Sequence, residues 1–499
     1  MKFLIIVSIS LLFAIPCGAR IITVDDDGPA DFNNIQAAID DSNDGDIIEV
    51  NVGTYTGDGN RDIDFLGKAI TVRSTEPNDP NTVAATIIDC NGNWSDNHRG
   101  FIFDSNENYD SVLLGITITN GFFGFIEEEG GAIYCNGSSP TISKCRIINN
   151  EANYGGGIAC IDSNAIISDC TIKGNYTEGC GSNGGGIYCT GSDLLIKRCV
   201  ITENSSRDRQ GGGIFCSDSN CVITQCLISG NKCGEEGGGI ACVDANAEIN
   251  CSTIADNRGY GGGGIRVYSG SVVVRNSILW GNRAAFGNQI SLRGNFDNKG
   301  KIELSYCDIE GLQQGIYIDW QGELNLNIGN INEDPVFIQA GLWDDNGTPD
   351  WIRDDIFLGG GDYHLKSEGW YWHTGRKVWT WDEDVTSRCI DAGNPGSALG
   401  DELLTIPSDP NNDWGENLRI NMGAYGGTAE ASMPPYDWAL LSDITNDGAV
   451  DFVDFAYLAD IYANQDDELP ADFDRDGDVD YGDLSLLVDD WLKQTSWYE

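Results

Sequence analysis

A pattern of apolar and polar positions recurs six times from about residue 131 to residue 282. Each copy places glycines just before an isoleucine, and an asparagine follows 17 positions after that isoleucine. Successive isoleucines are 25 to 29 residues apart. A period of this length predicts a solenoid, in which each repeat is one turn that buries its apolar face only against its neighbours. The isoleucine and asparagine pairs are Ile133/Asn150, Ile158/Asn175, Ile187/Asn204, Ile214/Asn231, Ile240/Asn257 and Ile265/Asn282.

The order of residues inside each repeat predicts strands rather than helices. Residues 184–189 read Gly-Gly-Gly-Ile-Tyr-Cys, so that inward and outward positions alternate with a period of two. A second short strand follows in each repeat, as in residues 141–147. No amphipathic stretch long enough for a helix accompanies them. The turns are therefore expected to coil into a parallel β-helix of the all-β class.

Identical positions in successive turns of such a coil stack about 4.8 Å apart. The recurring asparagine should form a ladder of amides that hydrogen-bond one another along the axis, in a sharp turn that asparagine tolerates. Asn120 is expected to begin this ladder. The glycines before each isoleucine are expected at a tight corner.

Seventeen cysteines would ordinarily indicate a disulfide framework in a secreted chain. Nine of them occupy two repeat positions that point inward, so a buried ladder of free thiols is the simpler interpretation. Vertical neighbours are close enough to bridge, but their parallel side chains make the disulfide torsion awkward. Those nine are Cys135, Cys160, Cys189, Cys216, Cys242, Cys145, Cys170, Cys199 and Cys226. Outside the ladders, Cys180, Cys221 and Cys233 are the better disulfide partners. Zinc is not expected, because the cysteine spacing follows the turns and only three histidines exist.

Residues 1–19 have the three regions of a secretory signal peptide. Lys2 precedes the apolar run 3–15, and small residues lead to a cleavage site after Ala19. No later run is long and apolar enough to span a membrane. We therefore expect a secreted or cell-surface protein.

The formal net charge of −49 comes from 78 acidic and 29 basic residues, and it becomes −50 when Lys2 leaves with the signal peptide. Such a charge repels phosphate polymers, which argues against nucleic acid as a partner. It suits a secreted calcium-binding protein, although solubility alone also accounts for it.

The chain before the repeats is predicted to cap the coil. Residues 31–39 place apolar side chains at helical spacing, with Asp31 or Asn33 as the N-cap, so a short helix should close the end of the core. Short strands of the first turns are expected at 47–50, 69–72, 86–89, 100–103 and 116–120.

Two acidic loops near the C-terminus have the ligand spacing of calcium loops. Calcium takes six to eight oxygens around a sharp turn, which explains alternating carboxylates, a glycine at position 6 and an acid at position 12. Gly448 and Gly477 fill position 6, position 7 contributes a backbone carbonyl, and apolar helix patterns follow each loop. The pattern predicts two bound Ca²⁺ ions. The ligands are Asp443, Thr445, Asp447, Ala449, Asp451 and Asp454 in the first loop, and Asp472, Asp474, Asp476, Asp478, Asp480 and Asp483 in the second.

Residues 35–55 resemble the beginning of pectin-esterase-like and pectate-lyase-like right-handed β-helices. The repeats resemble the coils of secreted bacterial β-helix proteins, and four later segments look like the closing segments of a planctomycete-type family. These segments are 334–337, 362–365, 389–393 and 419–425. The resemblance implies a right-handed parallel β-helix over 20–329 and a closing region over 330–432.

The paired loops resemble a type I dockerin, with Asp at position 12 and no helix before either loop. This implies a small α-helical calcium-binding domain over 442–495, after a linker over 433–441, that folds on calcium and docks onto a cohesin partner. Thr445 replaces the usual acid or amide, which should weaken the first site. Residues 452–453 and 481–482 lack the hydroxyl pair that commonly directs cohesin recognition.

Two functional hypotheses follow from these resemblances. The first is a secreted polysaccharide lyase or O-glycosyl hydrolase in polysaccharide catabolism. The second is a non-catalytic surface or matrix protein whose solenoid binds glycan or protein. Catalysis needs opposed carboxylates, or acids beside a basic residue, and the sequence assigns no catalytic residue. Outward or loop candidates are Glu127, Glu128, Glu129, Glu235, Glu236, Arg198, Arg207, Arg209, Arg266 and Arg275.

An aromatic cluster is predicted to form a β-hairpin around residues 374–377. Its members are Trp370, Tyr371, Trp372, Trp379 and Trp381. Exposed rings would stack on sugar faces, whereas buried rings would close the C-terminal end of the solenoid. Packing in the cap is the favoured interpretation.

Overall fold

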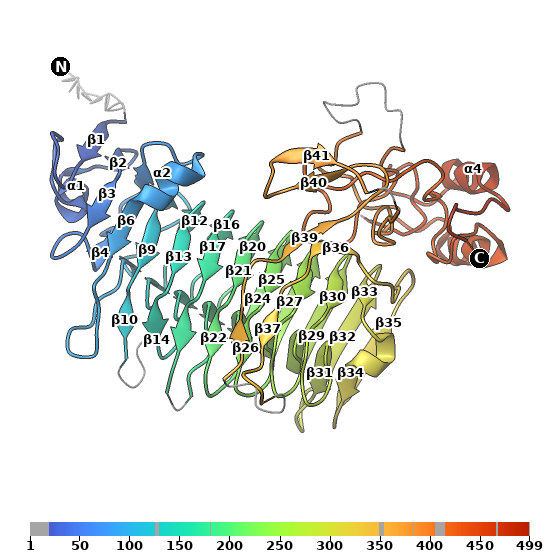
Figure 1. Cartoon of the computed structure of the whole chain (residues 1–499), viewed down its shortest axis with the longest axis horizontal. Coiled ribbons are helices and arrows are strands. Elements are labelled where there is room, and N and C mark those ends of the chain that lie inside the picture. The colour runs from blue at the N-terminus through green and yellow to red at the C-terminus, as the bar shows by residue number, and fades with distance from the viewer. Residues whose placement is uncertain are drawn as a thin grey trace, which may run out of the picture.

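The computed structural model is a long parallel β-solenoid with a returning arm and a small helical module at its C-terminal end (Figure 1). It describes residues 19–124, 129–179, 181–348, 354–382, 384–404, 415–465 and 468–498. The predicted signal peptide lies outside the described residues, apart from Ala19. In the described ranges, no helix is long and apolar enough to cross a membrane.

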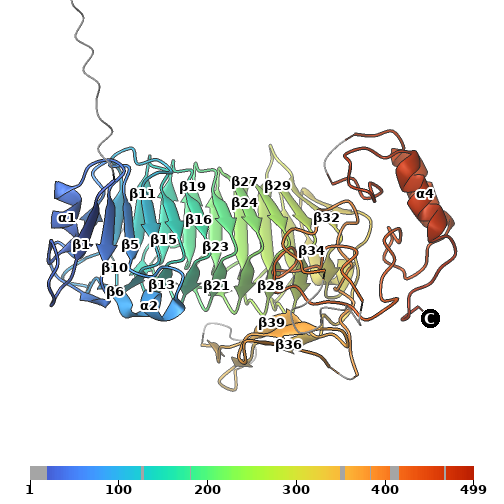
Figure 2. The same ribbon diagram turned by 90° about the horizontal axis from the view of Figure 1, so that it is seen from above.

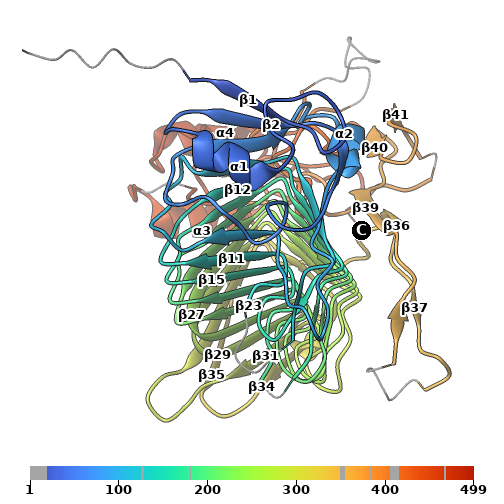
Figure 3. The same cartoon turned by 90° about the vertical axis from the view of Figure 1, so that its left-hand side faces the viewer.

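Each turn of the solenoid adds one strand to each of three long faces, and Figure 3 views the stacked strands from the N-terminal end. Two of these faces form one 20-stranded sheet, because β27 (Ile240–Asn250) and β29 (Ile265–Arg275) continue around the corner between them. The first face carries the isoleucines of the repeat. Besides the first halves of β27 and β29, it holds β4 (Ile63–Asp64), β7 (Phe101–Phe103), β11 (Ile133–Asn136), β15 (Ile158–Ile161), β19 (Ile187–Thr190), β23 (Ile214–Ser217), β31 (Ile290–Arg293) and β34 (Ile316–Ile318).

The second face shares that sheet, and the third face is a separate 10-stranded sheet. The second face holds β1 (Ile21–Val24), β2 (Ile47–Val50), β5 (Thr71–Ser74), β8 (Val112–Leu114), β12 (Thr141–Ser143), β16 (Ile166–Ser168), β20 (Leu195–Lys197), β24 (Asn220–Thr224), β32 (Gly300–Ser305) and β35 (Gly322–Leu326). The third face holds β3 (Gly53–Tyr55), β6 (Thr86–Asp89), β9 (Thr117–Thr119), β13 (Arg146–Ile148), β17 (Thr171–Lys173), β21 (Val200–Thr202), β25 (Leu227–Ser229), β28 (Thr253–Ala255), β30 (Ile278–Trp280) and β33 (Asp308–Ile309).

A short 5-stranded sheet lies between the third face and the next glycine corner. It holds β10 (Phe122–Phe123), β14 (Glu151–Ala152), β18 (Tyr176–Thr177), β22 (Ser205–Ser206) and β26 (Lys232–Cys233). Equivalent residues pair in parallel register, as Ile133 with Ile158 and Ile158 with Ile187. These isoleucines are fully buried in one apolar core that continues along the solenoid. The predicted parallel β-solenoid is confirmed.

The asparagine ladder is also confirmed. Asn231 is fully buried, and its Nδ2 donates to Oδ1 of Asn257 at 3.0 Å and to the carbonyl of Ile201 at 2.8 Å. The same amide-to-amide bond joins each step from Asn150 to Asn282. Asn120 does not begin the ladder, because it is exposed with φ of 56°. Its neighbour Gly121 takes the ladder position instead and donates its backbone N–H to Oδ1 of Asn150.

The nine ladder cysteines are buried and stack along the core in two rows, as the ladder interpretation expected, and none is bridged in this structure. The first ladder consists of Cys135, Cys160, Cys189, Cys216 and Cys242, and the second of Cys145, Cys170, Cys199 and Cys226. Thiols of the second ladder donate to the backbone carbonyl two residues earlier, as Cys170 does to Ser168 at 3.2 Å. Cys221 and Cys233 are buried and unbridged in this structure, and Cys180 lies outside the described residues.

The glycine corners are required by close approach of the turns. A Cβ on Gly157 would lie 2.6 Å from the carbonyl oxygen of Gly186 in the next turn, so a larger residue would push the two turns apart at this point. The equivalent residue one turn earlier is the small Ala132. Gly155, two residues earlier, has φ of 62°, in the left-handed region that side chains disfavour.

The predicted capping helix is α1 (Ile35–Asp41), which buries Ile35, Ala38 and Ile39 against the first turns. Its N-cap is Asn34, whose side chain accepts from the backbone of Ala37 at 2.8 Å. Both expected caps are therefore wrong, and Asp31 instead binds Thr23. A second helix, α2 (Pro80–Ala85), was not predicted.

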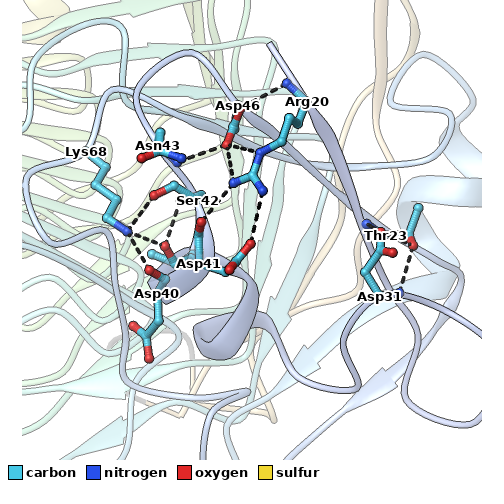
Figure 4. A network of polar contacts seen from close by, with 10 residues as sticks. Arg20, Thr23, Asp31, Asp40, Asp41, Ser42, Asn43, Asp46 and Lys68 are labelled. Atoms are coloured by element: carbon cyan, nitrogen blue, oxygen red, sulfur yellow. Dashed lines mark hydrogen bonds and ion pairs between the residues drawn. The ribbon is translucent and has the colours of Figure 1, made fainter. Parts of the chain in front are cut away.

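Polar contacts fasten the C-terminal end of α1 to the first turns (Figure 4). The ammonium of Lys68 donates to the carbonyls of Asp40 and Ser42, which satisfies acceptors at the end of the helix. Arg20 forms an ion pair with Asp46 at 2.8 Å. Although burial raises the pKa of Asp46, the bonds from Arg20 and nearby backbone hold it at about 2.

After β35, the chain reverses and runs back along the outside of the solenoid. This arm, residues 337–365, contains the antiparallel pairs β36 (Phe337–Gln339) with β39 (Asp362–Leu365), and β37 (Trp343–Asp344) with β38 (Ile356–Phe357). Figure 2 shows β36 and β39 beside the third face. A hairpin of β40 (Tyr371–His373) and β41 (Val378–Thr380) follows. The 3₁₀ helix η1 (Leu312–Gly315) precedes β34.

Glu402, in the closing region, makes the stability of the fold depend on pH. Its Oε1 accepts from the backbone of Asn421 and Gly427, whereas its Oε2 is buried and unpaired among the described residues. Burial raises its pKa from 4.5 to about 8. The folded state therefore holds the proton more tightly than the unfolded state, so this contribution to stability is complete below pH 4.5 and disappears as pH rises through about 8.

We expect raising the pH from 5 to 9 to lower the free energy of unfolding by about 3–5 kcal/mol through Glu402. Glu402→Gln keeps the group neutral and should flatten this part of the profile. Urea midpoints measured across this range would show the difference, with the exposed Glu248→Gln as control. Parallel profiles for the wild type and Glu402→Gln would contradict the assignment.

Paired acidic loops and a lateral groove as candidate sites

Each acidic loop leads directly into a helix. α3 (Phe452–Ile461) begins after Asp451, and α4 (Tyr481–Asp489) begins after Asp480. Each of these aspartates accepts a backbone N–H as the N-cap and donates its own N–H to the acid at position 12, Asp454 or Asp483, at 2.9 Å. Positions 9 and 12 therefore form a capping box that fixes the helix start relative to the loop.

The first loop wraps around the buried carboxylate of Asp443. Its Oδ2 accepts from the backbone of Gly448 at 2.9 Å, and its Oδ1 accepts from the hydroxyl of Thr445 at 3.2 Å and from the backbone of Asp447 at 3.3 Å. The carboxylate of Asp454 accepts from the backbone of Thr445 at 3.1 Å. Burial raises the pKa of Asp443 to about 6.

The second loop repeats this arrangement. Asp472 accepts from the backbone of Asp476 at 3.1 Å and of Gly477 at 3.0 Å. Oxygens from Asp472, Asp474 and Asp476 lie within 4.8 Å of one another. Burial, followed by repulsion from neighbouring carboxylates, raises the pKa values of Asp472 and Asp474.

These residues fit a calcium ion. The donors are all oxygens, and the glycines at position 6 have φ of 91° and 95°, which supplies the sharp turn that a calcium loop needs. The position 7 residues, Ala449 and Asp478, donate their N–H groups to the carboxylates of Asp447 and Asp476. A divalent cation would remove the repulsion that the clustered carboxylates create.

The module that carries these loops packs against the end of the solenoid. Phe473 and Val479 of the module share one buried cluster with Ile278 and Tyr306 of the solenoid. The predicted linker 433–441 is part of this packing, since Met433 and Trp438 are buried.

Side chains at position 4 of both loops bind the solenoid and its closing region. Asn446 donates to the carbonyls of Gly329 at 2.9 Å and Ala392 at 2.7 Å, and Arg475 donates to those of Pro395 and Leu418.

The closing region also donates a hydrogen bond to the first loop. The buried Arg419 of the closing region donates to the backbone carbonyl of Asp443, the first residue of that loop, at 2.7 Å. It also binds the carbonyl of Gly393 at 2.6 Å. Arg419 therefore links the first acidic loop to the closing region through hydrogen bonds.

The outward arginines named from the sequence form ion pairs with acids of neighbouring turns. Four of the named residues gather at one place, where Arg209 and Arg266 pair with the adjacent Glu235 and Glu236, and Arg198, Arg207 and Arg275 pair with acids elsewhere. The pairs are Arg198 with Asp169, Arg207 with Glu178, Arg209 with Glu235, Arg266 with Glu236 and Arg275 with Glu248. Glu129 pairs its backbone with Tyr154, while Glu127 and Glu128 lie outside the described residues.

A lateral groove of about 550 Å³ lies between the late turns of the solenoid and the arm. Arg258, Tyr260, Arg283 and Glu310 line it on the solenoid side, and Asp345 lines it on the arm side. None of these five residues was named as a candidate from the sequence.

A buried set of contacts joins the arm to the solenoid beside the groove. Arg258 forms a buried ion pair with Asp355 of the arm, and its guanidinium lies 4.5 Å from the ring centroid of Trp343. The indole of Trp343 donates to the carbonyl of Asp256 at 2.7 Å. The phenol of Tyr363 donates to the carboxylate of Asp256 at 2.8 Å.

The polar groups inside the groove are held in fixed positions. Oε2 of Glu310 accepts from the backbone of Gly281 at 2.9 Å and from the amide of Gln289 at 2.8 Å. Arg283 lies one turn after Arg258, and the backbones of the two residues pair in parallel. The side chain of Arg283 is exposed. A guanidinium and a carboxylate are therefore presented to solvent in one depression.

A row of aromatic rings runs along the axis beside the groove. The rings of Tyr260 and Phe286 lie 5.4 Å apart, and those of Phe286 and Tyr317 lie 4.7 Å apart. Tyr260 is 59% exposed and Tyr317 is 40% exposed. Three successive turns thus present partly exposed rings in one row, and Tyr260 at one end of this row lines the groove.

One sequence signal could have indicated the solenoid side of the groove. Lys232, Arg258 and Arg283 each follow a ladder asparagine, so three consecutive turns carry a cation at one position of a very acidic chain. Nothing periodic indicates Asp345 or Trp343, because the arm lies outside the repeats.

The predicted aromatic hairpin is confirmed as β40 and β41. Its rings pack mainly on one another, with Trp370 against Trp381 at 5.0 Å and Trp372 against Trp379 at 5.8 Å. Tyr371 is buried and Trp381 is 50% exposed, so the hairpin has one side packed in the cap and one side open.

The comparisons with known proteins indicate a fold. The family described as a right-handed β-helix region matches residues 78–251, 133–297 and 185–347, which together span 78–347. A crystal structure of pectate lyase Pel9A is similar at 14% sequence identity, over 82% of this chain and 96% of that chain, with a TM-score of 0.39. That score is too low to carry an argument about activity. No curated protein matches the chain.

Proposed function

Because the chain belongs to the right-handed β-helix family, we propose that its stacked turns form a rigid platform that binds an extracellular neutral polysaccharide along the lateral groove. The observation that carries this proposal is the row of rings formed by Tyr260, Phe286 and Tyr317. Aromatic faces pack on the apolar faces of sugar rings, and convergent polar groups fix the orientation of the ligand.

Charge favours a neutral glycan over an acidic one. The chain carries a net charge of −49, which repels a polyanion at low ionic strength. Within the groove, Glu310 and Asp345 add negative charge, and Arg258 is already neutralised by Asp355. Sugar hydroxyls both donate and accept, so they match the carboxylate of Glu310 and the guanidinium of Arg283.

Replacing Tyr260 by alanine is expected to weaken binding of a neutral polysaccharide by about 5- to 30-fold, because a stacking surface is lost at the groove edge. Affinity electrophoresis in gels that contain neutral or uronate polysaccharides measures this change. Tyr109→Ala removes a ring that is 51% exposed on an early turn and serves as the matched control. Equal loss in both variants, or tighter binding to uronate polymers, would contradict the proposal.

Cleavage of the bound glycan is a separate question that needs a variant of a groove carboxylate. A lyase or hydrolase needs an acid and a base placed on opposite sides of the scissile bond. Glu310 is the groove carboxylate fixed by two hydrogen bonds, so it is the first residue to test. New reducing ends or unsaturated products that vanish in Glu310→Gln would identify an enzyme. Binding without product would identify the non-catalytic platform.

The acidic loops are proposed to hold two Ca²⁺ ions through the twelve predicted ligands. The converging oxygens of Asp443 and Asp472 and the left-handed glycines support this assignment. We further propose that the chain is exported by its N-terminal signal peptide, whose cleavage after Ala19 would leave Arg20 as the first residue. N-terminal sequencing of protein recovered from the medium would test the cleavage site.

A protein partner of the cohesin type is proposed for the two helix starts. Phe452 and Tyr481 are each 73% exposed and occupy the same position of the two loops, and Val453 is 56% exposed. A double variant, Phe452→Ala with Tyr481→Ala, should weaken capture by an immobilised cohesin module at least about tenfold in calcium. Val488→Ala, on an exposed position of α4, is the control. Absence of any capture of the wild type would refute this partner.

A further inference from the structure

The turn that carries Cys216 differs from its neighbours at one inward position. Cys221 on β24 pairs with Ala247 in the following turn, and it lies beside the position of Leu194 in the preceding one. In this part of the described solenoid, only this turn therefore presents a thiol from the second face toward the first cysteine ladder.

The two thiols face each other across a corner. Cys216 lies in β23 and Cys221 in β24, and Asp218 between them has φ of 49°, which turns the chain sharply. The Sγ atoms of Cys216 and Cys221 are 2.8 Å apart, and both residues are buried. A disulfide bond length is about 2.05 Å, so a small rotation of the side chains would bring the sulfurs to bonding distance.

We propose that Cys216 and Cys221 form a disulfide within this one turn. The thiolate of one cysteine attacks a small-molecule disulfide, such as oxidised glutathione, and releases one thiol. The thiolate of the second cysteine then displaces the remaining thiol from the mixed disulfide. The two cysteines lose two electrons and two protons, and the oxidant is reduced to two thiols. The bond forms during folding, before the neighbouring turns cover both sulfurs.

The geometry selects this pair among the neighbouring thiols. Cys189, in the preceding turn, has its Sγ 3.6 Å from that of Cys221, which is farther than Cys216. Cys189 and Cys216 are vertical neighbours on parallel strands, where parallel side chains make the disulfide torsion difficult. Cys216 and Cys221 instead approach from two strands that meet at a corner, and only four residues separate them.

A soft metal ion held by Cys189, Cys216 and Cys221 is the competing use of this cluster, since one sulfur of each lies within 4.8 Å of the others. Three thiolates around one ion would leave net negative charge inside an apolar core. The disulfide leaves this core neutral, which favours oxidation over metal binding.

Peptide mapping of the full chain, purified without reductant, tests the proposal. The protein is denatured in acidic guanidinium with N-ethylmaleimide and digested with trypsin. The peptide 210–232 contains Cys216, Cys221 and Cys226. We expect one maleimide, on Cys226, and a mass two hydrogens below that of the peptide with two free thiols. Prior reduction should yield three maleimides.

Three other outcomes would overturn the proposal. The first is three maleimides on this peptide without reduction. The second is a crosslink to the peptide 174–197, which contains Cys189. The third is a stoichiometric metal in the native protein that is lost in Cys221→Ser. Cys170→Ser, which alters the second ladder only, should leave the crosslink intact and controls for general disturbance of the core.

Discussion

Replacing Asn231 by alanine is expected to lower the free energy of unfolding by about 3–6 kcal/mol, because several buried groups lose their partners at once. Asn231 donates to the carbonyl of Ile201 and to the amide of Asn257. Its own Oδ1 accepts from both the backbone and the side chain of Asn204. All three ladder amides are buried, so water cannot replace the lost bonds.

Asn220→Ala is the matched control for this variant. Asn220 lies in the same turn and also stacks, since its amide donates to Asp193 at 2.8 Å and accepts from Asn246 at 3.1 Å. It is exposed, so its loss should cost below about 1 kcal/mol. Urea midpoints, with hydrogen exchange of the backbone around Asn204, measure both variants. Equal effects of the two substitutions would show that stacking, and not burial, sets the energy of the ladder.

Chelation of calcium is expected to lower the melting temperature and to release the closing region as well as the helices. Each ion bound at 100 times its dissociation constant stabilises the folded state by about 2.7 kcal/mol, so two sites contribute about 5 kcal/mol. The effect should reach the solenoid because Arg419 binds the carbonyl of Asp443 and because Asn446 binds Gly329.

The measurement is a pair of thermal scans in calcium and in EGTA, with hydrogen exchange at the backbone bond from Met422 to Cys389 as the local probe. A double variant, Asp472→Ala with Asp483→Ala, should reproduce half of the loss, because it removes one site. Asp460→Ala changes an exposed acid of α3 outside both loops and is the control. Identical scans with and without calcium would refute the metal assignment.

Features that repeat, or that have a fixed local spacing, were predictable from the sequence. The isoleucine, asparagine and cysteine positions recur with the turn, so their stacking follows from period alone, and Ile133, Asn231 and Cys170 lie where the pattern places them. The acidic loops were predictable for a related reason. Ligand positions within twelve residues are set by the local chain, so Asp443 and Asp472 converge on their own glycines.

The local predictions that were wrong concern positions where neighbouring residues can each take the same structural role. Asp31, Asn33 and Asn34 all have side chains that can cap a helix. The residue that directly precedes the first turn of α1 is Asn34, so it forms the N-cap. Asn120 precedes Gly121, and a shift of one residue decides which of the two faces the ladder.

The sequence by itself determined the coil, its ladders and the spacing of the acidic loops. Only the tertiary structure decided where the arm and the module come to lie. Arg258 meets Asp355 across 97 residues, and Asn446 meets Gly329 across 117. Neither contact belongs to a repeat, so the periodicity of the sequence does not predict it. Contacts of this kind depend on where the non-repeating segments pack on the outer surface of the solenoid. That surface is formed only when the turns have stacked.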